Sequence, residues 1–77
     1  MYIRSQNGIF LGNFDVIALE RQDVSKKWRV LGKVAGERFF LGDYKKQERA
    51  MQVVDDIQAR ISRHDKHGNF VYNMPKE

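Results

Sequence analysis

Residues 46–63, KQERAMQVVDDIQARISR, decide the fold of this chain. Apolar residues recur in this stretch three and four positions apart, which is the spacing of one face of a helix: Ala50, Val53, Val54, Ile57 and Ile61. Arg60 and Arg63 fall in the last turn, where positive charge suits the negative end of the helix dipole. The pattern therefore predicts one amphipathic helix over about residues 46–63.

The chain before this helix has the pattern of β-strands. Five short stretches are rich in β-branched and aromatic residues or alternate in polarity: 2–6, 9–11, 16–21, 28–35 and 38–44. Asn7-Gly8 is the strongest hairpin signal between them, and Ala35-Gly36-Glu37 is another. We therefore predict an α+β fold, with an antiparallel meander of about five strands over 2–44, the helix, and a short extended tail over 69–75.

The short length of the chain limits the size of its core and therefore its stability. Its 77 residues make a single domain, 1–77, whose core is small for its surface. There is no cysteine, so neither disulfides nor thiolate metal sites can supplement the core. Association with further copies of the chain is the simplest remaining source of buried area. We therefore expect a homo-oligomer.

Two apolar segments bear on this expectation. In a regular strand, Phe39 and Leu41 would face one side of the sheet, while Phe40 and Tyr44 would face the other. One helix covers only one face, so the second face would need the tail or another subunit as its cover. The tail, Asn69 to Pro75, is itself apolar. It either forms an edge strand on its own domain or docks on a partner.

The charge of the chain is +4 and is concentrated in its centre. Between Arg21 and Arg49 lie nine basic and four acidic residues. Such a segment favours an anionic partner, a nucleotide or a nucleic acid. It is equally consistent with a solvated basic face that serves solubility.

Groups for catalysis are missing from the sequence. There is no cysteine nucleophile, no nucleophile elbow and no Walker-type phosphate loop. His64 and His67 flank Asp65, but no further ligand completes a four-coordinate metal site. No apolar run is long enough for a signal peptide or a membrane span. We expect a cytoplasmic binding protein that uses no cofactor, no metal and no membrane.

The first strand offers binding chemistry. Arg4, Ser5 and Gln6 supply a guanidinium fork, a hydroxyl and an amide, and Tyr2 shares a strand face with Arg4 and Gln6. A fork grips phosphate, an amide reads a base, and a ring stacks on one. Tyr44 and Tyr72 could add stacking surface. The predicted ligand site is therefore Tyr2, Arg4, Ser5, Gln6, Tyr44 and Tyr72; alternatively, these are polar strand residues and a core tyrosine.

Three short motifs stand in a distinctive order: Ile3-Arg4-Ser5-Gln6, Leu41-Gly42-Asp43-Tyr44 followed by Glu48-Arg49-Ala50, and Met74-Pro75 near the end. Through these motifs, about half of the chain resembles a family of small proteins encoded by phages and prophages of Gram-positive bacteria. One departure is that the family often has Ser or Thr before the helix, where this chain has Lys45 and Lys46. A lysine cannot cap the helix, so the first turn frays or the lysines hold an anion there.

The resemblance implies a setting and a function. A phage protein of this kind would act in the host cytoplasm during infection, and several compact phage proteins are sponges for cyclic-nucleotide signals. It implies a non-catalytic oligomer that sequesters a signal such as cyclic GMP-AMP. Such a protein counters the cyclic-oligonucleotide antiphage defence (CBASS) and is called an anti-CBASS sponge. Two alternatives stay open. One is a DNA- or RNA-binding accessory protein that stacks bases on Trp28, Phe39 and Phe40. The other is an inhibitor that binds a host protein.

Overall fold

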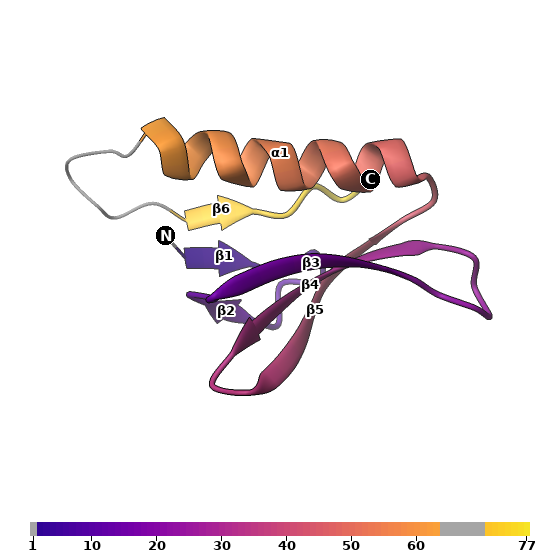
Figure 1. Cartoon of the computed structure of the whole chain (residues 1–77), viewed down its shortest axis with the longest axis horizontal. Coiled ribbons are helices and arrows are strands. Elements are labelled where there is room, and N and C mark those ends of the chain that lie inside the picture. The colour runs from indigo at the N-terminus through magenta and orange to yellow at the C-terminus, as the bar shows by residue number, and fades with distance from the viewer. Residues whose placement is uncertain (1, 64–70) are drawn as a thin grey trace.

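The structure is a computed structural model that describes residues 2–63 and 71–77. Its elements follow one another as β1 (Tyr2–Arg4), β2 (Leu11–Gly12), β3 (Val16–Arg21), β4 (Trp28–Val34), β5 (Glu37–Tyr44), α1 (Gln47–Arg63) and β6 (Val71–Asn73), as Figure 1 shows. The predicted α+β class is confirmed. The helix begins one residue later than predicted and ends at Arg63, as predicted.

The strands form two sheets rather than one meander. β3, β4 and β5 make an antiparallel sheet in that order, whereas β1 lies between β2 and β6 in a second sheet. β1 pairs with β6 in parallel, with Tyr2 opposite Val71. The predicted meander of about five strands is found only over β3–β5, because β2 pairs with β1 and not with β3. Asn7-Gly8 does form a turn, with Gly8 at φ 79°, but inside a longer connection between Arg4 and Leu11.

The β4–β5 hairpin turns where it was predicted. Ala35 and Gly36 form its two-residue loop, with φ values of 53° and 81°. Positive φ at both positions is the type I′ geometry that matches the twist of the flanking strands. Farther along, the register jumps, so that Val30 faces Gly42 while Leu31 faces Phe40. Leu41 is thus the extra residue of a β-bulge, which reverses the alternation of the side chains beyond it.

This bulge corrects the predicted faces of β5. Leu41 and Tyr44 do not point to opposite sides, because both belong to the core beneath α1. Phe39 also lies on the inner side, where its ring packs against those of Phe10 and Phe14 at centroid distances of 5.5 and 5.8 Å. Phe14 covers Gly32 so closely that a Cβ there would lie 2.6 Å from the ring. The inner face of the sheet is therefore covered within the chain.

The outer face of the same sheet carries ion pairs. Arg29 makes two hydrogen bonds to the Asp43 carboxylate, at 2.8 and 3.2 Å, and Arg38 pairs with Glu20 at 2.8 Å. Phe40 is half exposed here, with the Arg29 guanidinium 4.0 Å from its ring centre. Val16, 49% exposed, and the buried Leu31 lie on this face as well, so the face combines two ion pairs with apolar residues and is less apolar than the sequence suggested.

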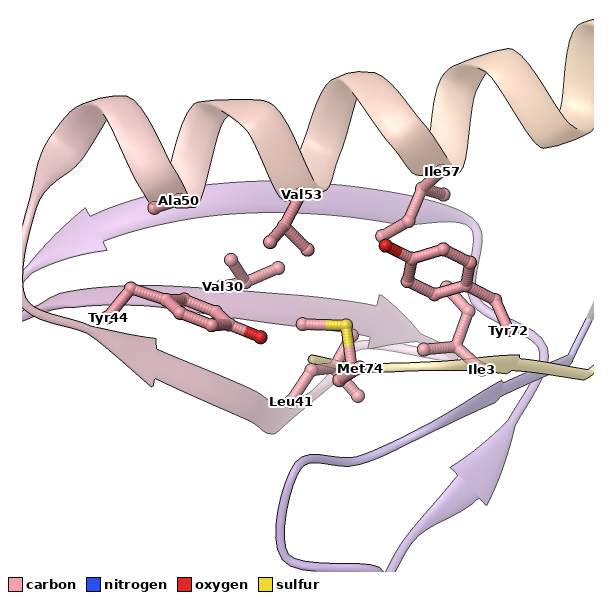
Figure 2. Close-up of a cluster of buried hydrophobic side chains, with 9 residues drawn as sticks. All are labelled: Ile3, Val30, Leu41, Tyr44, Ala50, Val53, Ile57, Tyr72 and Met74. Atoms are coloured by element: carbon pink, nitrogen blue, oxygen red, sulfur yellow. The ribbon is translucent and has the colours of Figure 1, made fainter. Parts of the chain in front are cut away.

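The core joins the helix, both sheets and the tail. α1 buries Ala50, Val53 and Ile57, as the periodicity predicted, while Ile61 remains 58% exposed. The small sheet and the tail contribute Tyr72 and Met74 to the same cluster, whose nine side chains Figure 2 shows: Ile3, Val30, Leu41, Tyr44, Ala50, Val53, Ile57, Tyr72 and Met74. Of the two interpretations of the tail, the strand that closes its own domain is confirmed.

Candidate anion-binding pocket

Residues 74–77, called the C-terminal strap below, cross from β6 to the first turn of α1. The Met74 N–H donates to the Arg4 carbonyl at 3.1 Å, which continues the pairing with β1. The Tyr44 hydroxyl donates to the Pro75 carbonyl at 2.8 Å, and Arg49 Nε donates to the Glu77 carbonyl at 2.9 Å. The strap is thus fastened to β1, β5 and α1 in turn.

Gln6 holds the strap against β5. Its backbone N–H donates to the Leu41 carbonyl at 2.6 Å, and its Oε1 accepts from the Asp43 N–H at 3.0 Å. Its Nε2 lies within hydrogen-bond distance of three carbonyls, those of Asp43 (3.2 Å), Pro75 (3.1 Å) and Lys76 (2.7 Å). The residue therefore pairs with the β5 edge much as a strand residue would, and its amide also anchors the strap.

A pocket of about 530 Å³ opens between the strap, the end of β5 and the start of α1. Its lining contains five basic side chains and two acidic ones: Gln6, Lys27, Asp43, Tyr44, Lys45, Lys46, Arg49, Lys76 and Glu77. One of the two acidic groups, Asp43, is already paired with Arg29. The pocket therefore presents an excess of positive charge.

Three of these cations are available to a ligand. Lys27, Lys45 and Lys46 are exposed, and their ammonium groups make no hydrogen bond or ion pair with any residue that the structure describes. Lys27 comes from the β3–β4 connection, whereas the other two precede α1. An ammonium group donates up to three hydrogen bonds and is a common ligand for phosphate. The arrangement suits an anion held from two sides.

The predicted site residues divide into two groups. Tyr2, 51% exposed, and Arg4 lie on the outer side of the small sheet, and neither lines the pocket. Arg4 Nε donates to the Gly8 carbonyl at 3.1 Å. Ser5 is buried; its hydroxyl donates to Asn7 Oδ1 at 2.7 Å and accepts from the Phe10 N–H at 2.9 Å. Arg4 and Ser5 thus fix the turn that precedes β2.

Gln6 and Tyr44 do line the pocket, but Tyr44 contributes no stacking surface. Its ring is only 2% exposed, and Tyr72 is only 6% exposed. Burial raises the pKa of Tyr44 to about 12 and also raises the pKa of Tyr72. The prediction that bases stack on these two rings does not fit the structure, because both side chains belong to the buried core cluster.

Sequence reasoning found part of the pocket and missed the rest. The lysines that replace a capping residue were recognised as possible anion ligands, and the basic segment included Lys27 and Arg49. Lys76 and Glu77 were missed because nothing local indicates that the strap returns to the start of α1. Long-range bonds from Gln6, Tyr44 and Arg49 place it there.

The remaining predicted residues lie away from the pocket or outside the described chain. Trp28 and Phe39 pack toward the core, so Phe40 alone of the three proposed stacking rings is half exposed. Within residues 2–63 and 71–77, no cluster of three or more His, Cys, Asp or Glu could hold a metal ion. His64 and His67 lie outside the described residues. In the same part of the chain, no helix has the length and apolarity needed to cross a membrane.

Comparisons with protein-family models, with curated proteins and with solved structures find no match to this chain. The resemblance to phage proteins therefore stays a prediction from the sequence.

Proposed function

We propose that this protein is a non-catalytic binding protein that holds a phosphate-bearing small ligand, a cyclic nucleotide, in the basic pocket. The observation that carries the proposal is the set of exposed lysines, Lys27, Lys45 and Lys46, which face one cavity without partners among the described residues. A cavity of about 530 Å³ falls within the usual range for small-ligand sites.

The lining favours recognition through phosphate. A cyclic dinucleotide carries two phosphodiester charges, which match cations that approach from the β3–β4 connection and from the start of α1. The positive end of the α1 dipole adds to the attraction for an anion placed there. No ring face is exposed in the lining, so the phosphates contribute more to affinity than the bases do.

Binding of this kind would act by sequestration. A protein that binds a signal tightly lowers its free concentration by mass action, and no bond needs to be broken. In the proposed setting, an oligomer in the cytoplasm of an infected cell would keep a cyclic-nucleotide immune signal from its effector. This would make the protein an anti-CBASS sponge, as the resemblance to phage proteins implies.

Isothermal titration calorimetry tests the proposal with a panel of cyclic GMP-AMP, cyclic di-AMP, cyclic AMP, a linear dinucleotide and inorganic phosphate. We expect at least one cyclic nucleotide to bind, with Lys46→Ala weakening it about tenfold through loss of a charge-assisted hydrogen bond. Lys33→Ala is the matched control, since Lys33 is exposed but does not line the pocket. The proposal is rejected if no member of the panel binds at a protein concentration of about 100 µM, at which even weak binding is detectable.

A gel-shift measurement at two salt concentrations separates this function from nucleic-acid binding. A small ligand in a pocket predicts negligible affinity for long oligonucleotides. Tight binding to DNA or RNA that falls steeply with salt would instead favour a nucleic-acid-binding accessory protein.

A further inference from the structure

The edge formed by β3 differs from every other strand edge in the described chain. β4 is the neighbour of β3 in the sheet, and no other described strand pairs with it. In contrast, Gln6 bonds the outer edge of β5 at Leu41 and Asp43. β2 and β6, the edges of the small sheet, are only two and three residues long. β3 is thus the long strand whose outer edge is unpaired over its whole length within residues 2–63 and 71–77, whereas β5 is unpaired only from Glu37 to Phe40.

The ladder shows which groups of β3 point outward. In an antiparallel pair, hydrogen-bonded and non-hydrogen-bonded positions alternate. The Gln22 N–H donates to the Lys27 carbonyl at 2.8 Å, which places the even-numbered residues of β3 in the bonded positions facing β4. The N–H and C=O groups of Ile17, Leu19 and Arg21 therefore point away from the sheet. No described residue makes a backbone hydrogen bond to them.

β3 lacks the usual protections of an open edge. Natural edge strands carry proline, a bulge or lysines that prevent pairing with another chain. Residues 16–19, Val-Ile-Ala-Leu, contain none of these, and β3 pairs with β4 in unbroken register. Ile17 and Leu19 are only partly buried and pack against the core cluster. A strand added here would place further side chains beside theirs on the same face of the sheet.

The charges at the two ends of β3 fit a second copy. Asp15 immediately precedes the strand and Arg21 ends it, and both are exposed. When two copies of β3 run antiparallel, the start of one meets the end of the other, so Asp15 and Arg21 approach each other at both ends. With Ala18 opposite the same residue of the second copy, Asp15 lies opposite Arg21, and the outward groups of Ile17 face those of Leu19.

We propose that this protein forms a two-fold dimer through β3, which joins two three-stranded sheets into one continuous sheet of six strands. The occupant of the edge is a second copy of this chain, held by backbone hydrogen bonds between Ile17 and Leu19 of the two copies and by the two contacts between Asp15 and Arg21. The dimer provides the oligomer of the proposed function. The inference rests on the β3 edge alone, not on the pocket.

Charge reversal tests the proposal through sedimentation velocity and light scattering on the full chain. The wild type should have twice the monomer mass of 9.1 kDa. Asp15→Lys or Arg21→Glu should raise the dissociation constant about tenfold, because each replaces two attractive cross-strand contacts by repulsive ones. The double variant, with both reversals, should restore the dimer. Asp55→Lys, at an exposed position of α1, is the control and should leave the dimer unchanged.

A second variant tests the backbone contacts. Arg21→Pro removes an N–H that points away from β4, so the chain should keep its circular dichroism spectrum and lose the dimer. The proposal is overturned if the wild type is monomeric at about 200 µM, because dimers with standard-sized interfaces associate more tightly than that. It is also overturned by an oligomer whose mass neither charge reversal changes. Calorimetry reports on the pocket separately, so loss of the dimer and loss of ligand binding are distinguishable.

Discussion

Replacing Gln6 by alanine should lower the free energy of unfolding by about 2–3 kcal/mol. Its Nε2 has two hydrogens for the carbonyls of Asp43, Pro75 and Lys76, so two bonds at most are donated at once, and Oε1 accepts a third. Each such bond contributes about 1 kcal/mol net. Water can reach this partly exposed position and replace some of the lost bonds, which keeps the loss near 2 kcal/mol rather than above 3.

Urea unfolding followed by the fluorescence of Trp28 measures this change. The midpoint should fall while the m-value stays constant, because the fold is unchanged. Gln6→Glu would place a carboxylate oxygen against the same three carbonyl oxygens, so its loss should be at least as large as that of Gln6→Ala. Gln58→Ala, at an exposed position of α1, is the control and should change stability by less than about 0.5 kcal/mol. A loss for Gln6→Ala no larger than that of the control would refute the role assigned to Gln6.

Three further changes test other parts of the fold. Gly32→Ala should cost about 1–3 kcal/mol, because the new Cβ would lie 2.6 Å from the Phe14 ring; combining it with Phe14→Leu should recover part of the loss, and a neutral Gly32→Ala would contradict the packing. Ala35→Asn should stabilise the protein by about 0.5–1 kcal/mol, since asparagine tolerates the φ of 53° better than alanine does; thermal unfolding with no gain would argue against the type I′ turn. Tyr44 should make stability fall as pH rises from about 10 to about 12, because burial raises its pKa to about 12 and its ionised form disfavours the fold. Unfolding free energies at pH 9 and 11.5 should show a smaller fall in Tyr44→Phe than in the wild type, and equal falls would contradict this assignment.

The sequence predicted the elements that depend on local pattern. The spacing of Ala50, Val53 and Ile57 located the helix, and Ala35-Gly36 located the β4–β5 turn. These signals are local because a helix face and a tight turn are each determined within a few residues. The strands β3, β4 and β5 followed for the same reason.

Long-range strand pairing could not be predicted from the sequence. The bulge at Leu41 inverts the alternation of β5, and a one-residue insertion into a ladder leaves no mark on the polarity pattern. The parallel pairing of β1 with β6 depends on where the chain returns after the helix. Gln6 has the same side chain whether it reads a base or anchors a strap, so only its partners distinguish the two roles.

The pairing of β1 with β6 has a consequence for how the molecule opens. Tyr2 pairs with Val71 across nearly the whole chain, and each strand has only three residues, so the contact costs much loop-closure entropy for few bonds. The β3–β5 meander and its two hairpins need no such closure. We expect the amides of β1 and β6 to exchange with solvent hydrogen together and earlier than those of β4, as one cooperative unit. The pocket loses its strap whenever this unit opens. A bound anion should therefore slow the hydrogen exchange of the β6 amides more than that of the β4 amides.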